Sequence, residues 1–232
     1  MRIQHARVSL GLHELAPGPR PALLLLHALY GSSADWDALP DWPGRIYALD
    51  FCGHGDSEWL AAGGYTPELL AADADCALAH IGGATIGGAG LGAYVALLLA
   101  GARRDLVPAA LLLPGNGLAG AGAVPDFDAP RTAFYGWDSA EPGGRAYDPA
   151  ATVLEEDIRP VDYVEPFARA ARKLLLVEDA RELPPWWLSV RASPNAEVLR
   201  TGLALTFTRL AERVCENRDQ IWNGRGKQNK LD

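Results

Sequence analysis

Short runs of consecutive apolar residues alternate along this chain with longer segments in which apolar residues recur at helical spacing. Residues 22–27 read ALLLLH, residues 109–113 read AALLL and residues 173–177 read KLLLV. Continuous apolar runs of this length are typical of strands that are buried on both faces of a parallel sheet. Their alternation with helical segments predicts βαβ units and therefore an α/β fold.

The same pattern places the individual elements. We predict an opening antiparallel hairpin within residues 3–14, strands at 22–27, 45–50, 84–88, 109–113, 173–177 and 196–201, and helices at 67–80, 91–100 and 203–216. The first helix has a clear start, because Thr66 is a good N-cap, Pro67 suits the first helical position and Glu68 meets the positive end of the helix dipole.

The region between the strands at 109–113 and 173–177 is rich in Gly, Pro and Asp and contains no strong strand signal. An insert at this point of an α/β chain is expected to cover the carboxyl ends of the strands as a lid. We therefore predict a single domain over residues 1–216 with a short lid insert at about 115–171. Residues 217–232 form a polar C-terminal tail.

Composition narrows the classes of partner. The 232 residues carry 29 Asp and Glu against 21 Lys and Arg, a net charge of −8, which argues against nucleic-acid binding. The three cysteines, Cys52, Cys76 and Cys215, are too few and too scattered for a disulfide framework or a zinc site. The first ten residues lack a signal-peptide core, and no apolar run approaches the ~18–20 residues that span a bilayer. We expect a cytoplasmic protein with no membrane segment, no cofactor and no bound metal.

Three motifs follow one another in the first half of the chain. Residues 27–36 read HALYGSSADW, residues 50–57 read DFCGHGDS and residues 84–96 read ATIGGAGLGAYVA. In order and spacing they resemble the oxyanion loop, the D-x-x-G-H-G-x-S turn and the strand–elbow–helix of the α/β-hydrolase superfamily. The resemblance covers residues 1–115 and is weaker beyond. It implies an α/β-hydrolase fold, with a mostly parallel twisted sheet, helices on both faces and a lid.

The resemblance also shows what this chain lacks. The nucleophile elbow of the superfamily reads G-x-S-x-G, whereas residues 88–92 read GAGLG, so Gly90 stands where the serine is expected. The general-base histidine normally follows the last strand, where this chain has Leu203, and all five histidines lie within the first 80 residues. The acidic partner is also displaced, because Glu178 and Asp179 precede the matching position at about 180–181.

Losing the nucleophile or the base of such a triad typically costs ~10⁶ in turnover. The resemblance therefore predicts no ordinary Ser-His-Asp hydrolysis, and we expect no catalytic residue at the degenerate positions 90 and 203. The oxyanion hole is built from backbone N–H groups, here those of Leu91 and of Leu29 or Tyr30, so it could outlast the serine. We expect His27, Leu29, Tyr30, Gly90 and Leu91 to line a ligand pocket.

Two single residues have a plainer and a more reactive interpretation. For His27 the plainer interpretation is a residue that anchors the loop. For Cys52 on its turn, a reactive thiol is the alternative to a structural role.

A second motif overlaps the elbow. Residues 88–93 also fit G-x-G-x-x-A between a strand and a helix, the dinucleotide-binding fingerprint. That fingerprint normally opens the first βαβ unit, whereas this one comes later in the chain. The next strand ends in Leu113-Pro114-Gly115, with no acidic residue to hold a ribose. The nucleotide interpretation is therefore the weaker one.

Three functions stay open. The favoured one is a catalytically silent hydrolase relative that binds a small apolar or carbonyl-bearing ligand, or a protein partner. The second is a lyase, isomerase or cyclase that needs no covalent step and uses the oxyanion pocket with His27, Asp50 or Tyr30. The third is a hydrolase with an unrecognised site.

Overall fold

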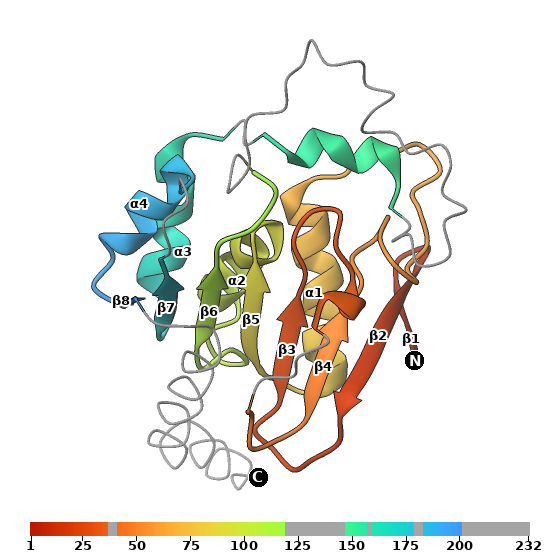
Figure 1. Ribbon diagram of the computed structural model, residues 1–232, viewed down its shortest axis with the longest axis horizontal. Helices are drawn as coiled ribbons and strands as arrows, with labels where there is room; N and C mark the ends of the chain where they lie inside the picture. Colours follow the sequence, from red (N-terminus) through yellow and green to blue (C-terminus); the bar gives the residue numbers. More distant parts are fainter. Residues whose placement is uncertain (37–40, 119–146, 157–158, 179–182, 201–232) are drawn as a thin grey trace, which may run out of the picture.

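The computed structural model describes residues 1–36, 41–118, 147–156, 159–178 and 183–200. Within them, eight strands form one sheet in the order β1-β2-β4-β3-β5-β6-β7-β8 (Figure 1). The strands are β1 (Arg2–His5), β2 (Val8–Ala16), β3 (Leu23–Leu26), β4 (Ile46–Leu49), β5 (Thr85–Ala89), β6 (Ala110–Leu113), β7 (Leu174–Val177) and β8 (Ala196–Leu199). The pairs β1–β2 and β2–β4 are antiparallel, and all later pairs are parallel.

The apolar runs form the centre of this sheet, as predicted. All residues of β3, β4, β6 and β7 are buried, because side chains of alternate residues enter two different cores. Leu24 and Leu26 of β3 belong to the larger core with the helices, whereas Leu23 and Leu25 belong to a smaller core with Trp36. This two-sided burial explains why the strands read as unbroken runs rather than as alternating patterns.

Helices cover the face of the sheet that carries the larger core (Figure 1). They are α1 (Pro67–Ile81), α2 (Leu91–Ala102), α3 (Glu165–Ala170) and α4 (Pro185–Arg191). The Thr66 side chain caps α1 by accepting a hydrogen bond from the Leu69 N–H, as predicted. On the opposite face, the described residues contribute the short 3₁₀ helix η1 (Ser33–Trp36). The helix predicted at 203–216 and the polar tail at 217–232 lie outside the described residues.

The region predicted as a lid contains two further 3₁₀ helices, η3 (Pro149–Leu154) and η4 (Val161–Val164). Residues 147–156 lie over the carboxyl ends of the central strands (Figure 1). The end of the same region does not lie over the carboxyl ends of the strands, because it forms α3, which packs against α2. Gly101 of α2 permits this approach, since a Cβ there would lie 2.5 Å from the Cα of Phe167. Within the described residues, no helix is both long and apolar enough to cross a bilayer.

Candidate functional site

Gly90 lies at the sharp corner between β5 and α2, where the elbow motif predicts it. Its φ of 53° and ψ of −116° form a backbone conformation that residues with a side chain rarely adopt. The flanking glycines allow the helix to approach the sheet closely. A Cβ on Gly88 would lie 2.1 Å from the carbonyl oxygen of Gly92, and a Cβ on Gly92 would lie 2.2 Å from that of Leu26.

The space beside Gly90 is filled by backbone of the loop that follows β6. A Cβ on Gly90 would lie 2.2 Å from the carbonyl oxygen of Asn116 and 2.5 Å from the carbonyl carbon of Gly115. Real Cβ atoms do not approach backbone this closely, so any side chain at position 90 requires the loop to move. Position 90 thus has no side chain, and the volume that a side chain would need is occupied by backbone.

The carbonyl of Asn116 also accepts hydrogen bonds from the two amides that the motifs predict as oxyanion donors. The Leu91 N–H donates to this oxygen at 2.9 Å, and the Leu29 N–H donates to it at 3.1 Å. Both distances are ordinary for such bonds. An internal carbonyl thus sits where the pair of amides would hold a substrate oxygen.

A small cavity that is lined by described residues lies next to this carbonyl. A cavity of about 10 Å³ lies against Gly90, lined by Pro114 and by Trp186 and Trp187 at the start of α4. This is about the volume that one water molecule needs. Both tryptophan side chains are buried in the larger core, so they pack the fold here and do not face solvent.

Solved structures with similar folds identify the architecture. Est1E from Butyrivibrio proteoclasticus, determined with bound ferulic acid, is 18% identical over 93% of this chain and 98% of its own, with a TM-score of 0.61. Est816, an N-acyl homoserine lactone degrading enzyme, is 15% identical over 94% of this chain and 98% of its own, with a TM-score of 0.65. The bottromycin epimerase BotH, in complex with bottromycin A2, is 17% identical over 93% and 98%, with a TM-score of 0.57.

This chain has the α/β-hydrolase fold. The prediction from the three motifs is confirmed at the level of the fold, and at these identities the likeness extends no further. No model of a protein family matches the sequence, and no curated protein does.

Within this hydrolase fold, His27 acts as an anchor between two loops. Its Nε2 accepts a hydrogen bond from the Phe51 N–H at 3.1 Å, so its Nδ1 carries the proton and donates to the carbonyl of Ala28 at 2.8 Å. The side chain is fully buried, and both ring nitrogens are used in this way. The geometry matches the loop-anchoring interpretation, and His27 offers neither nitrogen to a ligand.

Tyr30 sits in the same loop and reaches the segment above it. Its φ of 68° is unusual for a residue with a side chain, and its hydroxyl donates a hydrogen bond to Glu155. Its ring packs against Tyr147 with the ring centroids 4.7 Å apart. Tyr30 therefore links the predicted oxyanion loop to residues 147–156.

The remaining triad positions offer no replacement base among the described residues. Leu203, the predicted degenerate base position, lies outside them, as does Asp179. Glu178 follows β7, and its carboxylate is 3.4 Å from the guanidinium of Arg191. Among the other histidines, His5 pairs with Asp73 at 2.6 Å and His80 is exposed on α1.

Burial shifts the pKa values of two groups in the D-x-x-G-H-G-x-S turn, Cys52 and His54, away from neutral pH. Burial, and then the neighbouring carboxylate of Asp73, raise the pKa of the Cys52 thiol to about 12. Burial, and then His27 nearby, lower the pKa of His54 to about 3. A thiol of this kind stays protonated and an imidazole of this kind stays neutral at pH 7, so Cys52 is not the reactive thiol that was the alternative.

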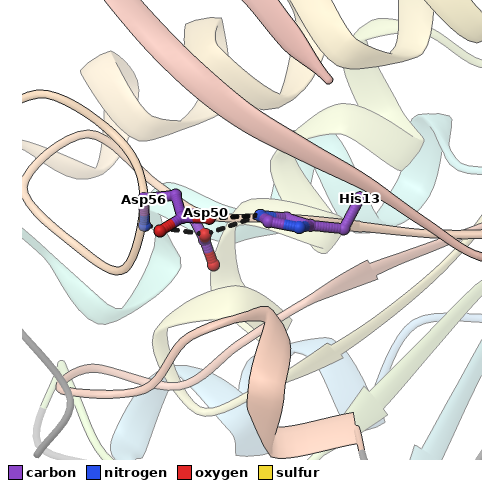
Figure 2. A group of neighbouring side chains, drawn as sticks. All are labelled: His13, Asp50 and Asp56. Atoms are coloured by element: carbon purple, nitrogen blue, oxygen red, sulfur yellow. Dashed lines mark hydrogen bonds and ion pairs between the residues drawn. The ribbon is translucent and has the colours of Figure 1, made fainter.

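One cluster was not anticipated from the sequence. Figure 2 shows His13 of β2 directed toward Asp50 and Asp56, which lie after β4. The sequence holds only a weak sign of this cluster. Gly11 and His13 are two residues apart, so they lie on one face of β2, and the glycine leaves room beside His13 for other side chains. Only the fold brings that face against the turn after β4.

Proposed function

We propose that this protein is catalytically silent toward esters and acts by binding, with either a small apolar ligand or a protein partner as the bound molecule. The observation that carries the proposal is the carbonyl of Asn116, which accepts from the amides of both Leu29 and Leu91. In an acyl-transfer enzyme these donors must be available for the oxyanion of the transition state. Here they already have an acceptor, beside a residue with no side chain.

The absence of the serine and the placement of the loop support each other. A hydroxyl at position 90 would have no room, and a substrate carbonyl would have to displace Asn116 from two hydrogen bonds. Each bond contributes on the order of 1 kcal/mol, and displacement would also move backbone that packs against Gly90. Among the described residues, the elbow therefore offers hydrolysis neither an attacking side chain nor an available oxyanion site.

The test is an assay with p-nitrophenyl acetate and p-nitrophenyl butyrate, using Gly90→Ala as the matched variant. We expect both proteins to release p-nitrophenol no faster than buffer alone. We also expect no covalent labelling of either protein by a fluorophosphonate probe. Turnover by the natural chain that Gly90→Ala abolishes would contradict the proposal and would favour a hydrolase with an unrecognised site.

The small-ligand form of the proposal can be tested at the same amides. Octanoate has an apolar chain and a carboxylate that could replace the carbonyl of Asn116 as the acceptor. Octanoate binding at the elbow would shift the amide resonances of Leu29 and Leu91 in a titration followed by NMR. Unchanged resonances at saturating octanoate would count against this form and in favour of a protein partner.

A second candidate function is a non-covalent reaction such as an isomerisation. The similarity to BotH favours this candidate, because BotH has a similar fold and is an epimerase. The three groups first considered for such chemistry are already bonded within the protein. His27 uses both ring nitrogens, Tyr30 donates to Glu155, and Asp50 accepts from backbone amides. We therefore place this candidate second.

A further inference from the structure

A second cavity, much larger than the one at the elbow, opens beside the hairpin of the sheet. Its volume is about 530 Å³, which is within the range of small-molecule sites. His13, Asp50 and Asp56 contribute to its wall, together with Ser33 and Trp36. None of the groups at the elbow lines this cavity, so it is a separate feature of the molecule.

The three side chains bring their ligand atoms close together. The Nε2 atom of His13 is 2.9 Å from the Oδ2 atom of Asp50 and 3.7 Å from the Oδ2 atom of Asp56. Figure 2 shows the three side chains directed toward one another. One ligand atom from each residue lies within 4.8 Å of the others. Among the described residues, no second group of three His, Cys, Asp or Glu side chains gathers this closely.

The backbone of β2 makes room for the cluster at Gly11. A Cβ there would lie 3.1 Å from Asp50 Oδ2, 3.1 Å from His13 Nε2 and 3.1 Å from the Cβ of Asp56. Glycine inside a strand costs about 0.5–1 kcal/mol relative to alanine, and it often marks a place where other groups approach closely. Any larger residue at position 11 would crowd all three members of the cluster.

We propose that His13, Asp50 and Asp56 bind a divalent transition-metal ion of the Zn²⁺ type at the wall of this cavity. An imidazole nitrogen and carboxylate oxygens are regular ligands of such ions. Ligand atoms around a tetrahedral ion with bonds of ~2.1 Å lie ~3.4 Å apart, and the two separations from His13, 2.9 and 3.7 Å, lie on either side of that value. The set as a whole lies within 4.8 Å, so its widest separation must shorten on binding, for which the exposed carboxylate of Asp56 is free to rotate. Coordination positions that the protein does not fill would face the cavity and take water.

Asp50 is already prepared for this role. Its side chain is 1% exposed, and its two oxygens accept from the N–H groups of Ser33 at 2.6 Å and Asp56 at 2.9 Å. The ion would take the place of the Nε2 proton of His13, which otherwise donates to Asp50. The amides of Ser33 and Asp56 would then act as outer hydrogen bonds, which orient metal-binding carboxylates.

Titration of tag-free, EDTA-treated protein with ZnCl₂ and CoCl₂ tests the proposal. We expect one ion per chain by isothermal titration calorimetry, and the visible absorption bands of tetrahedral or five-coordinate Co²⁺. His13→Gln and Asp56→Asn should each weaken binding at least about tenfold. His80→Gln, on the exposed face of α1, should bind like the natural chain. Asp50 is left unchanged because it also holds two loop amides.

Far-ultraviolet circular dichroism and urea unfolding would show whether each variant remains folded. Folding is expected, since the side chains of His13 and Asp56 are 29% and 73% exposed. Absence of stoichiometric binding by the natural chain would overturn the proposal. Equal binding by His13→Gln and the natural chain would overturn it too, and would leave the His13–Asp50 contact as a hydrogen bond that anchors the turn. The proposal does not depend on the function proposed for the elbow.

Discussion

The carbonyl group of Asn116 occupies the volume that a side chain at position 90 would need. With no Cβ at position 90, Gly115 can approach so closely that its own Cβ would lie 2.7 Å from the Gly90 N atom. The left-handed φ of 105° at Gly117 then returns the chain over Leu29 and Leu91. Glycines at positions 90, 115 and 117 are therefore jointly required by this loop path.

Serine at position 90 should destabilise the protein without creating an esterase. The residue would adopt a strained positive φ, which costs about 1–2 kcal/mol, and it would also displace backbone at Asn116, which costs a further ~1–3 kcal/mol. Urea unfolding of Gly90→Ser measures the sum. Gly64→Ser is the matched control, because Gly64 also has a positive φ, of 84°, but nothing lies within 4 Å of the added Cβ.

The difference between the two variants isolates the steric conflict at the elbow. We expect Gly64→Ser to lose only the conformational part, and Gly90→Ser to lose clearly more. Equal losses would mean that residues 115–117 move aside at no cost. In that case the loop would be a poor barrier, and the argument for a closed oxyanion site would fail.

At the scale of elements, residues 147–156 are fastened to the body of the molecule by several bonds. The Asp148 N–H donates to the carbonyl of Gly53 at 2.7 Å, and its carboxylate accepts from the Tyr65 hydroxyl at 2.6 Å. The far end of the segment is held by the Leu118 N–H, which donates to the carbonyl of Leu154 at 2.7 Å. These bonds keep η3 over the carboxyl ends of the central strands (Figure 1) and connect it to the loop that carries Asn116.

Tyr65→Phe should loosen this segment. The hydroxyl of Tyr65 also accepts from the Leu60 N–H at 3.0 Å, so its removal takes a partner from this partly buried amide and from Oδ2 of the buried Asp148, at a cost of about 1–3 kcal/mol. Hydrogen exchange of the amides in residues 147–154 should become faster. Tyr163→Phe loses only a solvent-exposed bond to Glu68 and should change stability by less than about 0.5 kcal/mol. Unchanged exchange in Tyr65→Phe would show that other contacts hold the segment.

The elements and the sharp turn at Gly90 could be predicted because they depend on neighbours in the sequence. Apolar runs located the strands, and Thr66-Pro67 located the start of α1 to within one residue. The contact of Asn116 with the predicted oxyanion amides could not be foreseen, since it joins backbone atoms of segments far apart in the sequence, and the glycines that permit it do not show which atoms will meet. The cluster around His13 was missed for a related reason, because the register of β2 against β4 decides which side chains meet.

At the scale of the whole molecule, stability is coupled to pH through groups buried beneath the turn after β4. His54 is fully buried, and its Nδ1–H donates to the carbonyl of Cys52. Its pKa of about 3 in the folded state lies well below the ordinary value of 6.5. Below pH 6.5 the unfolded chain therefore binds a proton that the folded chain does not, and stability falls as the pH falls.

The substitution His54→Asn should remove this contribution. Asparagine retains a donor for the Cys52 carbonyl but does not titrate. Between pH 6.5 and 5.0 the natural chain should lose roughly 1–2 kcal/mol more unfolding free energy than the variant, as expected for one histidine that stays neutral when folded. Other groups such as Asp50 and Asp73 are common to both proteins, so their effects cancel in the difference. Urea unfolding at several pH values measures it. Parallel pH profiles for the natural chain and His54→Asn would mean that His54 takes up its proton in the folded state, and that the turn after β4 is open to water.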